Sequence, residues 1–183
     1  MAGCHRGLES NPEMTDRRII AVDPGANGAI VVSDKSGTSK WWRMPEIGQY
    51  LPLLRSVKTD RAIFVIEAQS GAGSVRTNPV MMFRFGMRYG AWLIAAQAAG
   101  IEMHAVTPQR WMSGLNLGFV GNLKADQRKG LKQAEVDRRN ATAKRNWKNH
   151  LKDVATELYP KTKVILDNAD ALLIAEYARR FIA

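Results

Sequence analysis

The feature that most constrains the fold is an apolar segment that ends in an aspartate, a glycine-containing turn and a second apolar segment. Residues 18–22 precede Asp23-Pro24-Gly25, and residues 28–34 follow Asn27. Short apolar runs bounded by Pro, Gly and Asn are typical of β-strands joined by a turn. The pattern places Asp23 at the end of a buried strand, where a carboxylate needs a partner. A divalent metal is one candidate, and a simple turn role for Asp23 is the alternative.

Length and composition indicate one globular domain that binds a polyanion. The chain has 183 residues, of which 45% are hydrophobic, and this is enough for a full core. The formal net charge is +10 and the pI is about 10.0, which favours nucleic acid as the partner. A generic basic surface is the alternative explanation of the charge.

Several classes of protein are disfavoured. Cys4 is the only cysteine, so the sequence predicts neither a disulfide framework nor a cysteine-based zinc site. Apolar runs all fall short of the roughly 20 residues that span a bilayer. Residues 1–17 are polar and resemble a flexible leader, with Met14 as a plausible native start, and residues 18–183 form the expected domain. We expect a soluble protein of a reducing, intracellular compartment.

The remaining periodicity predicts a mixed sheet with helices on its faces. Strands are expected over residues 18–22, 28–34, 38–44, 61–68 and 101–106, and helices over residues 47–57, 79–99, 109–113 and 168–182. The helix over residues 47–57 has an apolar face that includes Ile47 and Leu54. Apolar residues from Trp147 to Leu158 form another helix face. Strand-helix-strand alternation in the later half indicates crossover connections in an α/β fold.

A basic stretch interrupts this pattern. Residues 122–152 contain ten Lys or Arg against three acids and few core positions. We interpret a segment of about residues 118–147 as a basic insertion or arm.

Four acids occupy positions from which they can converge. Asp23 and Glu67 end strands, and Asp167 and Asp170 lie three residues apart on one face of the last helix. Oxygen-only ligands suit Mg²⁺ or Mn²⁺, and two such ions can activate water for phosphodiester hydrolysis. Taken singly, Asp167 could be an N-cap and Asp170 a favourable first-turn charge. Taken together, the four acids favour a metal site.

These motifs resemble a known family. The order Asp23-Pro24-Gly25, Val65-Ile66-Glu67 and Asp167-x-x-Asp170 is similar to that of RuvC-type Holliday junction resolvases of the RNase H-like superfamily. Residues 82–92 and 106–111 look most like the phage and chloroplast branches. The resemblance covers residues 18–115 and 147–183.

The resemblance implies an α/β RNase H-like fold with a mixed five-stranded sheet flanked by helices. It also implies a homodimer that makes paired, symmetric nicks in a four-way DNA junction during recombination and repair. Asp23, Glu67, Asp167 and Asp170 would be catalytic ligands of two Mg²⁺ or Mn²⁺ ions. The expected location is the cytoplasm of a bacterial cell, phage-infected or not, or an organelle.

Other residues are expected to contact DNA. After Glu67, a loop offers small or basic residues to phosphate, namely Ser70, Gly71, Gly73 and Arg76. Arg110 is a further basic candidate, and a helical stripe is formed by Lys144, Lys148 and Lys152. The family has a lysine near the start of this helix that assists the scissile phosphate, and Lys148 is the nearest match. A mobile loop and a solvated helix face are the alternatives.

Two further questions stay open in the sequence. Gly86 and Gly90 lie four residues apart in the helix over residues 79–99, which suggests close packing against another helix, within the chain or in a dimer.

The alternative functions are a nuclease for other branched DNA and a non-catalytic branched-DNA-binding protein.

Overall fold

The structure is a computed structural model that describes residues 17–34, 39–68, 78–118 and 125–183. The predicted leader therefore falls almost wholly outside the described residues. So do four predicted DNA contacts, namely Ser70, Gly71, Gly73 and Arg76.

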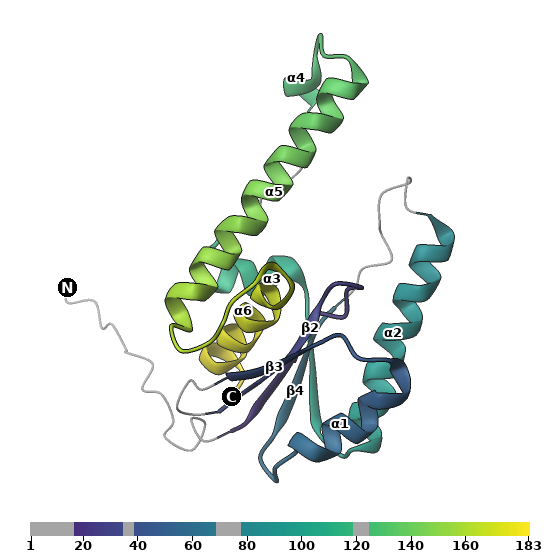
Figure 1. The fold of residues 1–183 in the computed structure, drawn as a ribbon, viewed down its shortest axis with the longest axis vertical. Helices are drawn as coiled ribbons and strands as arrows, with labels where there is room; N and C mark the ends of the chain where they lie inside the picture. The colour runs from purple at the N-terminus through teal and green to yellow at the C-terminus, as the bar shows by residue number, and fades with distance from the viewer. Residues whose placement is uncertain (1–16, 35–38, 69–77, 119–124) are drawn as a thin grey trace, which may run out of the picture.

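A mixed five-stranded sheet forms the centre of the molecule (Figure 1). The strand order is β3-β2-β1-β4-β5, and the strands are β1 Ile19–Val22, β2 Ala29–Ser33, β3 Ser39–Arg43, β4 Ile63–Glu67 and β5 Glu102–Val106. Strand β2 pairs antiparallel with both β1 and β3, whereas β1, β4 and β5 are parallel neighbours. All five predicted strands and the mixed sheet are confirmed.

Helices cover both faces of this sheet (Figure 1). The 3-10 turn η2 Ile47–Gln49 leads into α1 Tyr50–Val57, and α2 Pro79–Ala98 packs beside α1 on the same face. The opposite face carries α3 Pro108–Gly114, α5 Gln133–Leu158 and α6 Leu166–Phe181, while the short α4 Ala125–Arg128 lies at the far end of α5.

Successive side chains along each strand point to opposite faces of the sheet, which divides the core into two layers. In β1, Ile19 and Ala21 face α6, whereas Ile20 and Val22 face α1 and α2. Residues 63–66 of β4 are completely buried, which confirms the prediction that this apolar strand is covered on both sides. Helix α6 is buried from residue 168 to residue 178 and anchors the α5 side of the sheet.

Two expectations about helices are corrected. Ile47 was predicted to lie on a buried helix face, but residues 47–49 form a 3-10 turn and its side chain is 40% exposed. Helix α5 runs unbroken from residue 133 to residue 158, so Lys148 lies in its middle and not near its start. In the part of the chain that the structure describes, none of the helices is long and apolar enough to cross a membrane.

The turn between β1 and β2 has no room for a side chain at Gly28. The Gly28 amide donates to the Gly25 carbonyl at 3.0 Å, and the Asp23 amide donates to the Ala29 carbonyl at 3.1 Å. A Cβ at residue 28 would lie 2.1 Å from the Asp23 carbonyl oxygen and 2.9 Å from its carboxyl carbon. Glycine is therefore required sterically for the bend that orients Asp23.

We expect Gly28→Ala to destabilise the protein by about 3 kcal/mol, because the added methyl group would overlap backbone that cannot move without breaking this turn. Thermal and urea unfolding measure the effect. Gly48→Ala is the matched control, since a Cβ at residue 48 meets nothing within 4 Å and the change should stay within about 0.5 kcal/mol. Equal stabilities of the two variants would show that the turn relaxes.

Candidate active site

The sheet register places Asp23 and Glu67 side by side. Val22 of β1 is opposite Ile66 of β4, so the next residues, Asp23 and Glu67, end neighbouring parallel strands at the same edge. Parallel strands are about 4.8 Å apart, which brings the two carboxylates within electrostatic reach of each other. The carboxyl edge of the sheet is therefore acidic, as the sequence predicts.

Helix α6 brings a third carboxylate to this edge. Asp170 lies in its first turns and is only 7% exposed. The buried Asn168 fixes the start of the helix, because its Oδ1 accepts from the Ile165 amide at 2.8 Å and its Nδ2 donates to the Lys163 carbonyl at 3.1 Å. Ile165 is the N-cap residue, so the alternative interpretation of Asp167 as the N-cap is wrong.

Lys148 of α5 is the cation of the site. Its ammonium forms an ion pair with Asp170 Oδ2. Burial opposes the charge on Lys148, but Asp170, Asp23 and Glu67 together raise its pKa above the ordinary value. Asp170 Oδ1 is buried and makes no hydrogen bond with any of the described residues. One carboxylate oxygen of the site thus points to a position that no donor from the described residues fills.

Burial and the charges of neighbouring carboxylates raise the pKa values of the two strand-end acids. Burial, followed by the charge of Asp23, raises the pKa of Glu67 from 4.5 to about 7, although Trp111 Nε1 donates to Glu67 Oε2 at 3.0 Å. Burial also raises the pKa of Asp23, against the hydrogen bond from the Gly25 amide to Asp23 Oδ1 at 2.9 Å. Asp170 adds to both shifts. Asp23, Glu67 and Asp170 therefore share one electrostatic environment.

Asp167 occupies a more exposed position one turn earlier in α6. Its Oδ2 lies 3.6 Å from Arg43 Nη2, in a pair whose side chains are 34% and 76% exposed. Sequence reasoning missed Arg43. The signal was present, because β3 runs parallel to β1 and its last residue must reach the same sheet edge.

The other predicted DNA contacts are dispersed around this edge. Arg110 lies at the start of α3, is exposed, and its Nε donates to the hydroxyl of Tyr177 at 3.0 Å. Lys144 is exposed and Lys152 is half-buried, on either side of Lys148 along α5. The structure thus groups Lys148 with the acids and places Arg110, Lys144 and Lys152 at the periphery.

Trp111 of α3 is completely buried. It also donates the hydrogen bond to Glu67, which sequence reasoning did not foresee. A buried tryptophan needs a partner for its N–H, and the position of Trp111 five residues after the end of β5, the neighbour of β4, was the available clue.

The donor chemistry of the site fits a hard cation. Carboxylate oxygens are the ligands that Mg²⁺ and Mn²⁺ prefer, and Asp170 Oδ1 is a buried oxygen to which none of the described residues donates. The side chains are not arranged as a finished coordination shell, since no three His, Cys, Asp or Glu side chains among the described residues cluster closely enough to hold an ion. Lys148 and Arg43 instead hold two of the acids in ion pairs.

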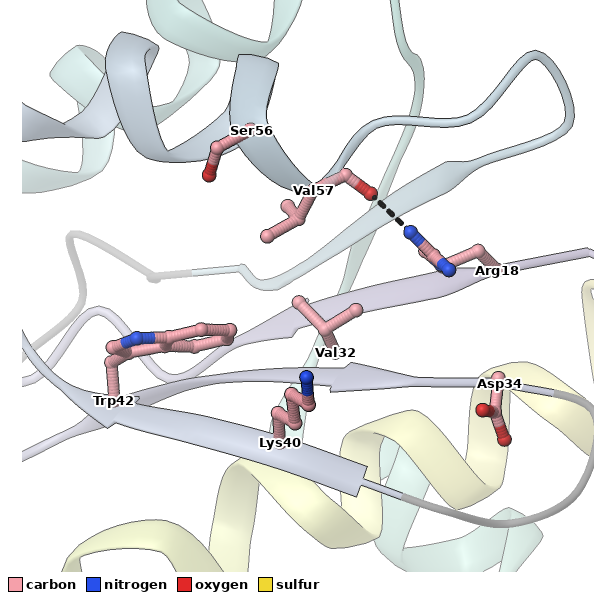
Figure 2. Close-up of a pocket in the computed structure, with 7 residues that line it drawn as sticks. All are labelled: Arg18, Val32, Asp34, Lys40, Trp42, Ser56 and Val57. Carbon is pink, nitrogen blue, oxygen red and sulfur yellow. Dashed lines mark hydrogen bonds between the residues drawn. The ribbon is translucent and has the colours of Figure 1, made fainter.

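A separate cavity of about 390 Å³ lies on the α1 side of the sheet (Figure 2). Trp42, Val32 and Lys40 project into it from the strands, while Ser56 and Val57 close it from α1. Arg18 Nη1 donates to the Val57 carbonyl at 3.0 Å across it. Its lining contains none of the four acids, so the cavity is distinct from the acidic edge.

Comparisons with known proteins match the fold. No protein-family model and no curated protein matches the sequence. The structure of Thermus thermophilus RuvC aligns with a TM-score of 0.52 and 15% identity, over 89% of this chain and 95% of that one. T. thermophilus RuvC in complex with a Holliday junction substrate aligns with a TM-score of 0.53 and 14% identity, over 90% and 96% of the two chains. The protein therefore has the RuvC-like, RNase H-like fold that the sequence motifs implied.

The raised pKa of Glu67 predicts a stability that falls as pH rises. Between pH 4.5 and about 7 the folded protein retains the Glu67 proton that the unfolded chain has released. Release of this proton on unfolding favours the unfolded state more strongly as the pH rises. In metal-free buffer the free energy of unfolding should decrease across this window, with a contribution from Glu67 of up to about 3 kcal/mol. Glu67→Gln should flatten the dependence in urea titrations at pH 5.5 and 7.5.

Glu102→Gln is the control for this measurement. Arg17 and His104 lower the pKa of Glu102, which is exposed on β5, so its contribution lies below the same window. A Glu67→Gln protein with the same pH slope as the unaltered protein would contradict a raised Glu67 pKa.

Proposed function

We propose that this protein is a metal-dependent, structure-selective endonuclease that resolves four-way DNA junctions by paired symmetric nicks. The observation that carries the proposal is the set of carboxylates from the ends of β1 and β4 and from α6, partly buried at Asp23 and Glu67 and buried at Asp170, beside Lys148 at the carboxyl edge of a RuvC-like sheet. The resemblance of residues 82–92 and 106–111 supports membership of the phage and chloroplast branches.

The acids are proposed to hold two Mg²⁺ or Mn²⁺ ions, with Asp23, Glu67 and Asp170 nearest one another and Asp167 at the exposed side. Ions bound there would supply Lewis-acid activation of water and neutralise charge on the phosphate. Glu67 must lose its proton before it can act as a ligand, because a carboxyl group with a pKa of about 7 is half protonated at neutral pH. Metal affinity should therefore increase from pH 6 to pH 8.

Lys148 has a separate proposed role. Its side chain is 39% exposed although the ammonium pairs with Asp170, so the lysine can contact a phosphate at the site without leaving the helix face. A fixed positive charge beside the reacting phosphate stabilises the negative charge that develops there. Arg110, Lys144 and Lys152, and the loop residues Ser70, Gly71, Gly73 and Arg76, are proposed to bind the flanking DNA.

We expect Asp23→Asn to lower the rate at which a mobile four-way junction is cleaved with Mg²⁺ by about a hundredfold or more, because a metal ligand is lost from the sheet edge. Binding should persist or tighten, since the change removes a negative charge. Cleavage and gel-shift assays with junctions, forks and flaps side by side measure both effects and identify the preferred branched substrate.

Asp60→Asn is the matched control, because Asp60 is exposed in the turn before β4. The Asp60→Asn protein should cleave the junction at the same rate as the unaltered protein. If the unaltered protein binds junctions but cuts none of them with Mg²⁺ or Mn²⁺, the protein is a binding protein and the nuclease proposal is wrong.

A homodimer is proposed to provide the two active sites. The face of α2 carries a seam with alternating spacings of three and four residues, formed by Val80, Phe83, Met87, Gly90 and Ile94. The four large side chains are 47–69% exposed, and a Cβ at Gly86 or Gly90 would meet nothing within 4 Å. The intramolecular packing that the two glycines suggested is thus absent from the described residues. A second copy related by a two-fold axis would cover this seam and suit two symmetric cuts.

We expect Met87→Lys and Ile94→Lys to convert a dimer into a monomer, because each places a charge in the apolar seam. Light scattering and sedimentation equilibrium should give twice 20.4 kDa for the unaltered chain and about 20.4 kDa for the variants. Ile47→Lys, at a residue that is 40% exposed on the 3-10 turn, should leave the mass unchanged. An unaltered protein that is monomeric at its highest soluble concentration would refute this interface.

A further inference from the structure

Helix α5 continues well past the sheet edge at which the acids lie. Figure 1 shows its N-terminal half extending beyond α6 and the strands, with α4 at the far end. Every residue from 137 to 146 is exposed or only partly buried. The same stretch is the basic segment that interrupts the resemblance to the family. The core needs only the C-terminal part of α5, which includes the buried Leu151 and Ala155.

After Glu135 and Asp137 in its first turns, the charged residues of this helix are all basic as far as Lys152. Residues 138–152 contain six Lys or Arg and no Asp or Glu. The exposed apolar side chains between residues 137 and 146 are only alanines, so the surface offers charge and not an apolar patch. A polyanion is the partner that such a surface complements.

Helical geometry aligns most of these cations with Lys148. At 3.6 residues per turn, five side chains fall within a sector of about 120°. We call this sector the α5 basic strip, and its members are Arg138, Lys144, Arg145, Lys148 and Lys152. Arg139 lies about 180° from Lys148 and is outside the strip. Because Lys148 contacts Asp170, the strip passes the acids, and Arg145, Lys144 and Arg138 lead away from them along the projecting part of α5.

We propose that the α5 basic strip binds the phosphate backbone of a duplex arm of the DNA substrate and sets its direction from the cut. The inference rests on the proposed function, which supplies the scissile phosphate at the acids. Arg138 is ten residues from Lys148, which corresponds to about 15 Å along the helix. A duplex rises 3.4 Å per base pair, so Arg138 reaches phosphates about four to five base pairs from the cut.

The existing ion pairs of the arm do not block this contact. Arg138 and Arg139 both pair with Glu135, at 2.6 Å and 2.8 Å, and their side chains are 75% and 54% exposed. Exposed pairs of this kind are weak, so a phosphate can replace the carboxylate. The two arginines are adjacent and share the same partner, but they lie on different sides of the helix. They form a matched pair for a test.

The experiment compares Arg138→Ala with Arg139→Ala in the full-length chain. Binding to a four-way junction is measured without divalent metal over a range of salt, with single neutral methylphosphonate linkages placed one to eight base pairs from the cut site. For the unaltered protein, neutralising the phosphate four to five base pairs away should weaken binding. Arg138→Ala should weaken binding, lose that positional effect and reduce the log–log salt slope by about 0.9. Arg139→Ala should behave as the unaltered protein does.

Two results would overturn the inference: equal weakening by Arg138→Ala and Arg139→Ala, or a positional phosphate effect that persists in Arg138→Ala. Cleavage by the unaltered protein with Mg²⁺ tests the proposed function separately. If the unaltered protein cleaves the junction but shows no positional effect that depends on Arg138, the proposed role of the α5 basic strip is wrong and the proposed nuclease function stands. An Arg138-dependent positional effect without any cutting supports the strip as a DNA contact and refutes the nuclease.

Discussion

The concentration of buried and partly buried carboxylates at one edge of the sheet is the constraint on which the rest of the structure depends. Burial, followed by the charges of Asp23 and Asp170, raises the pKa of Glu67, and burial with the charge of Asp170 raises the pKa of Asp23. Three groups from separate elements offset these shifts, namely Lys148 of α5, Trp111 of α3 and the Gly25 amide of the β1–β2 turn. Such a cluster persists only because the surrounding fold is rigid enough to hold it, and its electrostatic strain is what a divalent cation would relieve.

That rigidity comes from the two layers of core around the sheet. Strands β1 and β4 are buried on both faces, so neither can shift in register without exposing a full row of apolar side chains. The register fixes Asp23 against Glu67. Helix α6 is buried over eleven consecutive residues and its start is held by Asn168, which gives Asp170 a fixed position above β1 and β2.

The acidic edge belongs to a strongly basic protein, and the placement of the cations resolves the apparent conflict. Arg43 and Lys148 lie directly against the helix-borne aspartates, while Arg110 and the α5 basic strip surround or lead away from them. A polyanion would thus be attracted by the long-range field and brought to a small acidic centre. The apolar seam of α2 lies on the other face of the sheet, so a second copy bound there would leave α5 free.

The sequence by itself determined the strands, the mixed sheet and the position of Asp23 and Glu67 at strand ends, because these depend on local patterns: apolar runs, and Gly and Pro at turns. It also located the two glycines of α2 and the basic stretch. It did not determine the partners, because a side chain's environment depends on which distant segments pack against it. Only the tertiary structure paired Lys148 with Asp170 and Arg43 with Asp167, assigned Trp111 to Glu67, separated Asp167 from the buried acids, and extended α5 beyond the sheet. These contacts join residues 22 to 124 positions apart, and no periodicity in the chain encodes such distances.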